Sequence, residues 1–383
     1  MIRVFLRSLL ALALVAASVV VFQRVLRPAE LLEPGSADYP QLAAFKPNIT
    51  GRMALAPLMV DGRMRVYAAK RQIRADGPIA SKSIYTPHWS FRRWPQQLNG
   101  VVASGTMVIS RWSDGQLVAI DGLTGRIAWR APGPPAGGYT GHRTGAVTVW
   151  DPPGLHLANG SVVVSSGREL ASYDVTTGSR RFTISVPAGC TDGFTTAGGR
   201  YVCPTGAYDV ATGQPVASWP AGPYTPLGCA VAASLCAGLR DGASQGWRVD
   251  AAAPGRLAQL DQPGSTFFDG VVVSPTSDGR LESSNLRTGV HRLLPGGQVL
   301  GMSRGRLLIL LPSMRLRVVD LATGEVVIQI WLAVSKQELG WKLGHYQVVA
   351  GHIAMERLSR PGPANPDAVG YYVKVNPVVL CSV

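Results

Sequence analysis

Short apolar runs separated by turn-forming residues make up most of this chain after residue 100. Residues 161–165, 170–173, 307–311 and 316–319 are such runs, rich in Val, Leu, Ile and Tyr. Runs of this length bounded by Gly, Pro, Asn and Asp are typical of β-strands, whereas helices need ten or more residues at a 3.6-residue period. Few windows have the helical period, so the pattern predicts an all-β protein.

The N-terminus has a different pattern, typical of an export or anchoring helix. Residues 1–27 start with Arg3 and Arg7, continue through the uncharged run 8–22 and end with Arg24 and Arg27. This 15-residue run is shorter than the roughly 20 residues that cross a bilayer. Apolar residues 19–22 directly follow the small residues 16–18, which disfavours cleavage there. We therefore predict a single-pass signal-anchor with the rest of the chain outside the cytoplasm, and a cleaved signal peptide with secretion is the alternative.

The sequence divides into three regions. Residues 28–50 are rich in Pro, Ala, Glu and Gly without a sustained period, which indicates a linker. We therefore expect a signal-anchor or signal peptide at 1–27, a linker at 28–50 and one folded domain at 51–383.

A turn motif recurs through this domain, and its best copy is residues 119–129, AIDGLTGRIAW. Each copy has Asp or Asn, two variable residues and a pair that is usually Thr-Gly. Side chains of Asp, Asn and Thr accept backbone N–H bonds in such turns, and Gly supplies a positive φ. The predicted turn residues are Asp121, Thr124 and Gly125, followed by Trp129; Asp174 and Gly178; Asp209 and Gly213; Asn285 and Gly289; and Asp320 and Gly324.

The spacing of the turns predicts a repeat architecture. With a degenerate copy at 250–255 included, successive Asp or Asn positions lie 53, 35, 41, 35 and 35 residues apart. This matches one four-stranded propeller blade of ~40–45 residues. We expect seven or eight blades, with residues 346–380 forming one and residues 51–94 contributing the strand that closes the ring. The long first interval contains residues 131–160, which we expect to form a loop on one face.

Residues 119–129 resemble the blade signature of β-propellers related to pyrroloquinoline-quinone enzymes, in which the Trp packs against the next blade. Residues 87–93 are also similar to the start of membrane-tethered actinobacterial propellers of this group. The resemblance implies that Trp129 is a docking side chain. At its position, later units have Phe182, Ala217, Leu293 and Ile328, so other apolar side chains would make that contact.

The same resemblance raises the question of a quinone cofactor. Many quinone-dependent relatives carry two adjacent cysteines, but no two of the five cysteines here are adjacent. Nor can the usual calcium ligands be matched to this chain. We therefore predict no cofactor, no metal site and no catalytic residue.

The cysteine spacing predicts two disulfides. Cys190 and Cys203 are 13 residues apart, and Cys229 and Cys236 are 7 apart. Each pair is expected on the two strands before a turn, and Cys381 remains as a free thiol. In an exported chain disulfides are the usual interpretation, since a four-cysteine zinc site normally has closer pairs.

Two further signals are weak. Residues 301–305 match the GxSxG pattern of hydrolases, but that pattern requires a helix after the serine. Here an apolar strand follows, so Ser303 is interpreted as part of a blade. The net charge of +14 comes from scattered residues rather than a block, which makes nucleic-acid binding improbable.

We therefore expect a non-catalytic, membrane-tethered module, monomeric as a propeller, that binds or scaffolds a protein or an anionic envelope polymer. The alternative is an enzyme with a site in the propeller funnel, such as a quinone-dependent oxidoreductase or a polymer-cleaving enzyme. The sequence does not identify the ligand or partner.

Overall fold

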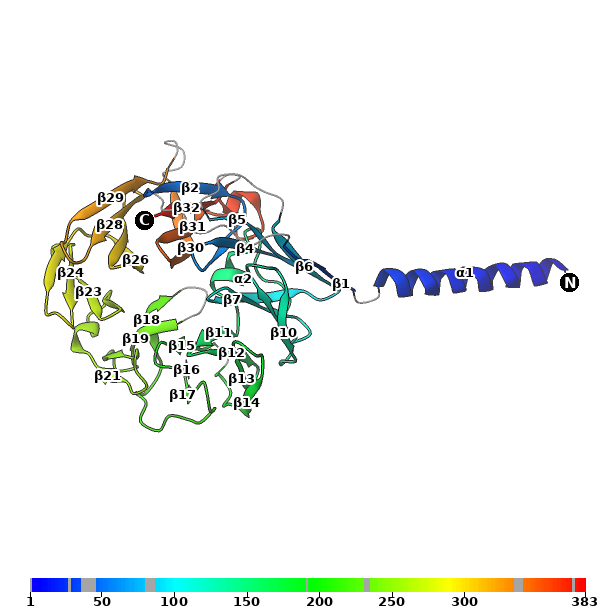
Figure 1. The fold of residues 1–383 in the computed structure, drawn as a ribbon, viewed down its shortest axis with the longest axis horizontal. Helices are drawn as coiled ribbons and strands as arrows, with labels where there is room; N and C mark the ends of the chain where they lie inside the picture. Colours follow the sequence, from blue (N-terminus) through cyan, green and yellow to red (C-terminus); the bar gives the residue numbers. More distant parts are fainter. Residues whose placement is uncertain are drawn as a thin grey trace.

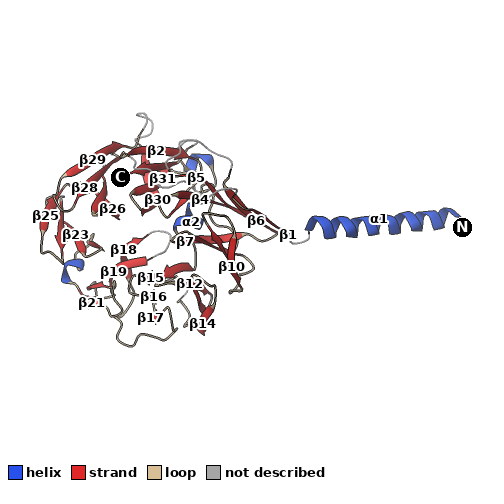
Figure 2. Ribbon diagram, viewed as in Figure 1, coloured by secondary structure: helices blue, strands red, loops and turns tan. Residues whose placement is uncertain are grey.

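The computed structural model describes residues 2–26, 29–35, 46–79, 87–190, 192–230, 235–333, 340–373 and 376–383. Helix α1 (Ile2–Leu26) stands away from the rest of the molecule, which is a ring of β-sheets that follow one another in chain order around a centre (Figure 1). Nearly all of the regular secondary structure in the described part of this ring is β-strand (Figure 2).

Four sheets of the ring are simple antiparallel meanders, with the first strand innermost and the fourth outermost (Figure 1). They contain β7 (Leu98–Ser104), β8 (Met107–Trp112), β9 (Leu117–Asp121) and β10 (Ile127–Ala131); β11 (Leu155–Ala158), β12 (Ser161–Ser166), β13 (Glu169–Asp174) and β14 (Arg180–Ser185); β22 (Thr266–Phe268), β23 (Val271–Pro275), β24 (Leu281–Asn285) and β25 (His291–Leu294); and β26 (Gln298–Ser303), β27 (Arg306–Leu310), β28 (Arg315–Asp320) and β29 (Val326–Trp331).

One seven-stranded sheet joins two antiparallel groups through a parallel pair between β15 and β19. The first group is β15 (Phe194–Thr196), β16 (Arg200–Cys203) and β17 (Gly206–Asp209). The second is β18 (Thr225–Ala230), β19 (Leu235–Arg240), β20 (Gly246–Arg248) and β21 (Gly255–Arg256). A short 3-10 helix (Ala258–Leu260) follows β21.

Residues 48–53 join the last strands of the chain in one sheet, and this pairing closes the ring. Its strands are β30 (Trp341–Val349), β31 (His352–Ser359), β32 (Val378–Ser382) and, outermost, β2 (Asn48–Met53), and a short 3-10 helix (Val369–Tyr371) precedes β32. β2 pairs with β32 from Asn48 opposite Ser382 to Met53 opposite Val378. A closing strand near residue 51 was predicted, and it starts three residues earlier than expected.

The first sheet has a fifth strand in the segment that we expected to be a linker. Its strands are β3 (Pro57–Val60), β4 (Met64–Ala69), β5 (Gln72–Pro78) and β6 (Trp89–Trp94), with β1 (Ala29–Glu33) paired outside β6. Residues 28–50 therefore contain β1 and half of β2 and differ from a simple tether. Their strand partners β6 and β32 are distant in sequence, which a search for local periodicity cannot detect.

The five repeated turns share one geometry at the end of the third strand of each sheet. Oδ1 of the Asp or Asn accepts bonds of 2.8–3.3 Å from the N–H groups two and three residues later. The carbonyl of the same residue accepts the closing glycine's N–H at 2.7–2.9 Å. These glycines have φ between 69° and 79°, a conformation that non-glycine residues adopt only at a cost.

Tryptophans link neighbouring sheets at these turns. A Cβ added to Gly178 would lie 2.5 Å from the ring of Trp129, whose Nε1 donates to a carbonyl of the same turn at 3.0 Å. Trp89 covers Gly125 in the same way and donates to a turn carbonyl at 2.7 Å. Trp89 is therefore a second docking tryptophan, in a unit whose turn motif is too degenerate to show it.

Later sheets make this contact with other side chains. Phe182 lies over the closing glycine of the next turn. Ala217 is exposed, and Leu293 is 49% exposed, so neither docks as an apolar replacement. Instead, the stem of Arg292 lies against Gly324, and its guanidinium donates to a turn carbonyl at 3.2 Å. The expectation for Leu293 was wrong because the neighbouring side chain, one position earlier, faces the turn.

The insertion at residues 131–160 enters the ring, contrary to the loop that we expected on one face. Its helix α2 (Ala146–Trp150) contacts β3, β4, β7 and β30. Ala146, Thr148, Val149 and Trp150 are buried, and Trp150 Nε1 donates to the Pro57 carbonyl at 2.9 Å. The apolar side chains of α2 therefore fill one side of the centre.

The hydrophobic core lies mainly between neighbouring sheets. One cluster joins β7–β9 to β11–β13, and another joins β27–β28 to β30–β32. Apolar packing between neighbouring sheets therefore stabilises the closed ring.

The described side chains of α1 project into solvent. Its leucine and valine side chains between residues 9 and 21 are 48% to 73% exposed. Within the described residues, no helix has the length and hydropathy needed to cross a membrane.

Candidate funnel site

A cavity of about 940 Å³ occupies the side of the ring centre that α2 leaves open. Residues at the start of β15, β18, β22 and β26, together with residues 344–346 in β30, form its wall. Trp150 and Asp151, at the end of α2, complete the wall. The innermost strands of several sheets thus converge on one funnel, and α2 limits its width.

The funnel wall combines aromatic and polar side chains. Phe194, Phe268, Tyr224 and Tyr346 supply aromatic surface from four different parts of the ring. Large, mostly apolar cavities with a few convergent polar groups are the usual form of a binding site. The arrangement can therefore hold a ligand with both apolar and hydrogen-bonding groups.

A histidine between two carboxylates connects α2 to the last sheet. His345 Nε2 lies 3.7 Å from Asp151 Oδ2, and its Nδ1 lies 3.6 Å from Glu356 Oε2. Contact with Asp151, followed by contact with Glu356, raises the pKa of His345 to about 9. Contact with His345 lowers the pKa of Asp151. The imidazole is therefore protonated at neutral pH and holds the α2 end against β30 and β31.

Glu356 also borders a second, smaller cavity. This cavity of about 420 Å³ lies between α2, β30 and residues 366–372, and His345 lines both cavities. Glu356 is buried, and Thr144 Oγ1 donates to its Oε1 at 2.6 Å. His345 thus lies between the two cavities and is held by a carboxylate on each side.

A buried neutral histidine lies in the adjoining sheet. His156 in β11 is 4% exposed and lies 5.7 Å from the Tyr201 ring. Burial lowers the pKa of His156 to about 4. Within the described residues, neither of its ring nitrogens has a hydrogen-bond partner. The side chain therefore packs as an aromatic group and is neutral at physiological pH.

The charged residues of the described funnel wall are Asp151, Asp192 and His345. With His345 protonated, their formal sum is about −1 at neutral pH, opposite in sign to the chain's net charge of +14. Within the described part of the chain, no group of three or more His, Cys, Asp and Glu side chains could hold a metal ion. The funnel therefore differs electrostatically from the outer surface.

The structure contains disulfides between Cys190 and Cys203 and between Cys229 and Cys236, the two pairs that the spacing predicted. The second pair joins facing residues of β18 and β19. Cys190, however, lies in the segment before β15 and not on a strand. Cys203, Cys229 and Cys236 line the funnel, so the disulfides brace part of its wall. Cys381 is free and buried.

Ser303 ends β26 in a tight hairpin, and its Oγ accepts the Gly351 N–H at 2.9 Å. The next element is strand β27, so the helix that a nucleophile turn requires does not follow it. The repeated turns lie near the outer strands, away from the funnel. The turn motif therefore marked the scaffold. The funnel residues Asp151 and His345, and Glu356 beside them, share no sequence motif.

Comparison with known proteins places these observations in context. Residues 86–192, just over a quarter of the chain, match the family described as "Outer membrane protein assembly factor BamB". This segment includes the AIDGLTGRIAW turn, the sheet β7–β10 that contains it and the following sheet, β11–β14. The chain is a β-propeller. The resemblance of the matched segment is to the PQQ-like type of blade.

No curated protein sequence matches the chain. Among solved structures, the computationally designed Ika8 protein is 15% identical with a TM-score of 0.50, covering 88% of this chain and 100% of that one. The C-terminal WD40 domain of Sif2 is 11% identical with a TM-score of 0.45, covering 91% and 99%. BamB from Moraxella catarrhalis is 13% identical with a TM-score of 0.34, covering 92% and 97%. At these identities, only the Ika8 likeness indicates a shared fold, and none indicates a shared activity.

Proposed function

We propose that this propeller is a non-catalytic binding or scaffolding module outside the cytoplasm, that α1 attaches it to the membrane, and that its funnel receives a segment of a partner protein. The observation that carries the proposal is the funnel, which is open on one side of α2 and lined by aromatic side chains from several sheets.

We infer that the ring has eight blades. Six sheets have four or five strands each, and the seven-stranded sheet contains two further antiparallel groups, which together make eight. The motif spacing supports two separate groups in that sheet, because the turns at Asp209 and Asp250 lie 41 residues apart. One such interval is the length of a blade.

The charge of the funnel favours a protein segment over an anionic polymer. Asp151 and Asp192 face the cavity, and His345 is the only cation among the described wall residues. His345 already contacts two carboxylates. A polyanion would lose favourable hydration beside these carboxylates without gaining a free cation. No contact in the described funnel favours the alternative of a quinone-dependent or polymer-cleaving enzyme.

Two features support a location outside the cytoplasm. Disulfides persist in oxidising compartments and are rare in the cytosol, and this chain has two. The matched family, by its description, contains an outer-membrane assembly factor.

Membrane attachment is supported by α1. Its described apolar side chains are solvent-exposed and contact no part of the ring. A helix with apolar residues on all sides is stable when it is buried in protein or lipid. Lipid is therefore the environment that suits α1.

The test is site-specific photo-crosslinking with the full chain in its native host. A photoreactive residue replaces Gln298, at the funnel wall, or Gln329, on the outermost strand of the same sheet. The proposal expects a defined protein adduct from position 298 and a much weaker one from position 329. Equal labelling at the two positions, or no adduct at position 298, would refute funnel binding.

A further inference from the structure

Exposed and partly exposed arginine and apolar side chains gather where α1 joins the ring. Leu31, Arg71, Arg92 and Trp94 form this anchor-side patch. Leu31 is 51% exposed and Trp94 is 36% exposed. Leu31 faces Arg92 across the β1–β6 pair, and Trp94 is two residues from Arg92 on the same strand. Directly opposed residues, and residues two apart, share one face of a sheet, so Leu31, Arg92 and Trp94 point the same way.

The two arginines of the patch keep their charge available. The Arg71 guanidinium lies 4.0 Å from the centre of the Trp94 ring, and its Nε donates to a backbone carbonyl at 3.3 Å. Arg92 donates to the neutral amide oxygen of Gln72 at 3.3 Å. Among the described residues, neither arginine is part of an ion pair. Both arginines can therefore bind an external anion without breaking an ion pair within the protein.

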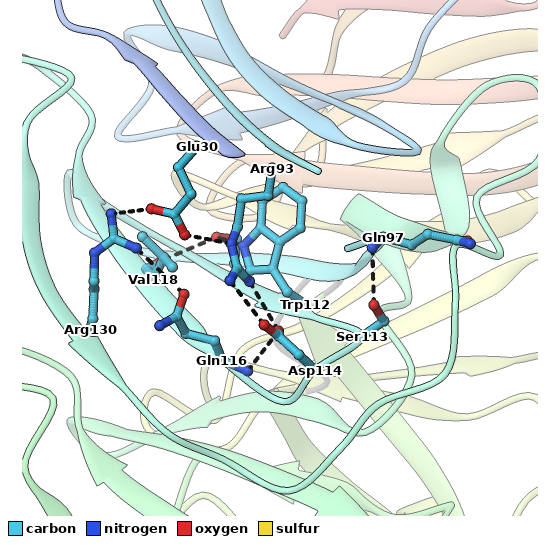
Figure 3. A network of polar contacts seen from close by, with 10 residues as sticks. Glu30, Arg93, Gln97, Trp112, Ser113, Asp114, Gln116, Val118 and Arg130 are labelled. Carbon is cyan, nitrogen blue, oxygen red and sulfur yellow. Dashed lines mark hydrogen bonds and ion pairs between the residues drawn. The ribbon is translucent and has the colours of Figure 1, made fainter. Parts of the chain in front are cut away.

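On the opposite face of β1, by contrast, the arginines form ion pairs with carboxylates (Figure 3). Glu30 forms ion pairs with Arg93 at 2.8 Å and with Arg130 at 2.7 Å. Arg93 also pairs with Asp114 at 2.9 Å. Contacts with Arg130 and Arg93 lower the pKa of Glu30 against the opposing effect of burial, so the network is charged at neutral pH. It fixes β1 to the first two sheets of the ring.

Because this ion-pair network fixes β1 to the ring, the patch must lie close to the end of α1. The helix ends at Leu26 and β1 begins at Ala29, which faces Trp94. Three Cα–Cα steps span at most about 11 Å. The polar layer on each side of a bilayer is roughly 5–8 Å thick. If α1 is in lipid, the patch must therefore lie beside or within the headgroup layer.

We propose that the anchor-side patch binds anionic phospholipid headgroups and so fixes the orientation of the propeller on the membrane. The inference rests on the proposed membrane attachment through α1. Tryptophan is enriched at membrane interfaces, and basic side chains near an anionic surface each strengthen binding. With β1 clamped, contact at the patch holds the ring on its edge, so that the funnel opens along the membrane rather than into it (Figure 1).

The test uses the full chain in vesicles with and without anionic lipid. A spin label is attached at Leu31→Cys, or at Leu293→Cys on the opposite side of the ring as a control with matched exposure of 51% and 49%. Exposure of each label to a water-soluble nickel chelate is measured, and flotation reports attachment. We expect shielding at position 31 only, and more of it with anionic lipid. Each of Arg71→Gln and Arg92→Gln should weaken the contact about fivefold, while Arg92→Lys should retain it.

The outcomes separate the two proposals. If the chain floats with vesicles but positions 31 and 293 are equally exposed, the patch proposal is wrong and attachment stands. The same conclusion follows if shielding at position 31 is equal with neutral and anionic lipid and insensitive to both glutamine variants. If the chain does not float with vesicles, both the attachment and the patch are refuted.

Discussion

Replacing Trp129 with alanine tests how the blades are held together. The side chain is 8% exposed, covers Gly178 and donates to the Val175 carbonyl at 3.0 Å. A buried tryptophan removes about 150–250 Å² from water, and at ~25 cal/mol per Å² this is worth roughly 4–6 kcal/mol as an upper bound. Alanine retains part of that burial, so we expect a loss of about 3–5 kcal/mol in the free energy of unfolding.

The measurement is urea denaturation followed by far-UV circular dichroism, since nine tryptophans would complicate fluorescence. Trp331→Ala is the control, because Trp331 is 45% exposed and the Arg315 guanidinium lies 4.4 Å from the centre of its ring. This variant should lose less than about 1 kcal/mol in the free energy of unfolding. Trp129→Phe keeps a ring over Gly178 and should lose mainly the hydrogen bond, about 1 kcal/mol beyond the change in packing. Equal losses for Trp129→Ala and Trp331→Ala would refute the docking role.

Three further predictions concern single positions. Gly178→Ala should destabilise the fold by about 1–3 kcal/mol more than Gly289→Ala in urea denaturation. The two glycines have nearly the same φ, 71° and 69°, but of the two only Gly178 lies under a side chain, the ring of Trp129. Equal losses for the two variants would contradict this. For His156, whose pKa in the folded chain is about 4, the free energy of unfolding should fall by up to about 3 kcal/mol as pH drops from 6.5 to 4. In that range the imidazole takes up a proton only in the unfolded chain. Acid-unfolding curves of His156→Gln should lack this pH dependence. For His345, whose pKa is about 9, the stabilisation is complete below pH 6.5 and is lost as pH rises through 9. Because the side chain is 39% exposed, the loss of stability should be about 1 kcal/mol. Thermal unfolding compared at pH 6.5 and 10 should show this loss in the unmodified chain but not in His345→Gln.

The repeated turns could be predicted from the sequence because their chemistry is local. Asp121 and Gly125 shape a turn through bonds that span at most four residues, and the other copies repeat the same contacts. Strand positions followed from the same local signal, as did the cysteine pairs. The unit that contains Trp89 has a degenerate turn motif, so its docking contact could not be recognised from the sequence.

The position of helix α2 and the funnel could not be predicted, because both depend on contacts between distant segments. Nothing in residues 146–150 shows that they pack against β3 and β30. Asp151 and His345 have no motif in common, and the ring alone brings them within 3.7 Å. Arg292 replaces a tryptophan through the length of its stem, which no apolar pattern can reveal.

Occupation of the funnel by a partner segment is tested most directly by hydrogen–deuterium exchange of the full chain isolated with its partners from native membranes. We expect slower amide exchange at the wall residues 297–300 and 344–346 than in the same chain stripped of partners, with no change on β28 and β29. Protection confined to the outer strands, with unchanged exchange at the funnel wall, would contradict it.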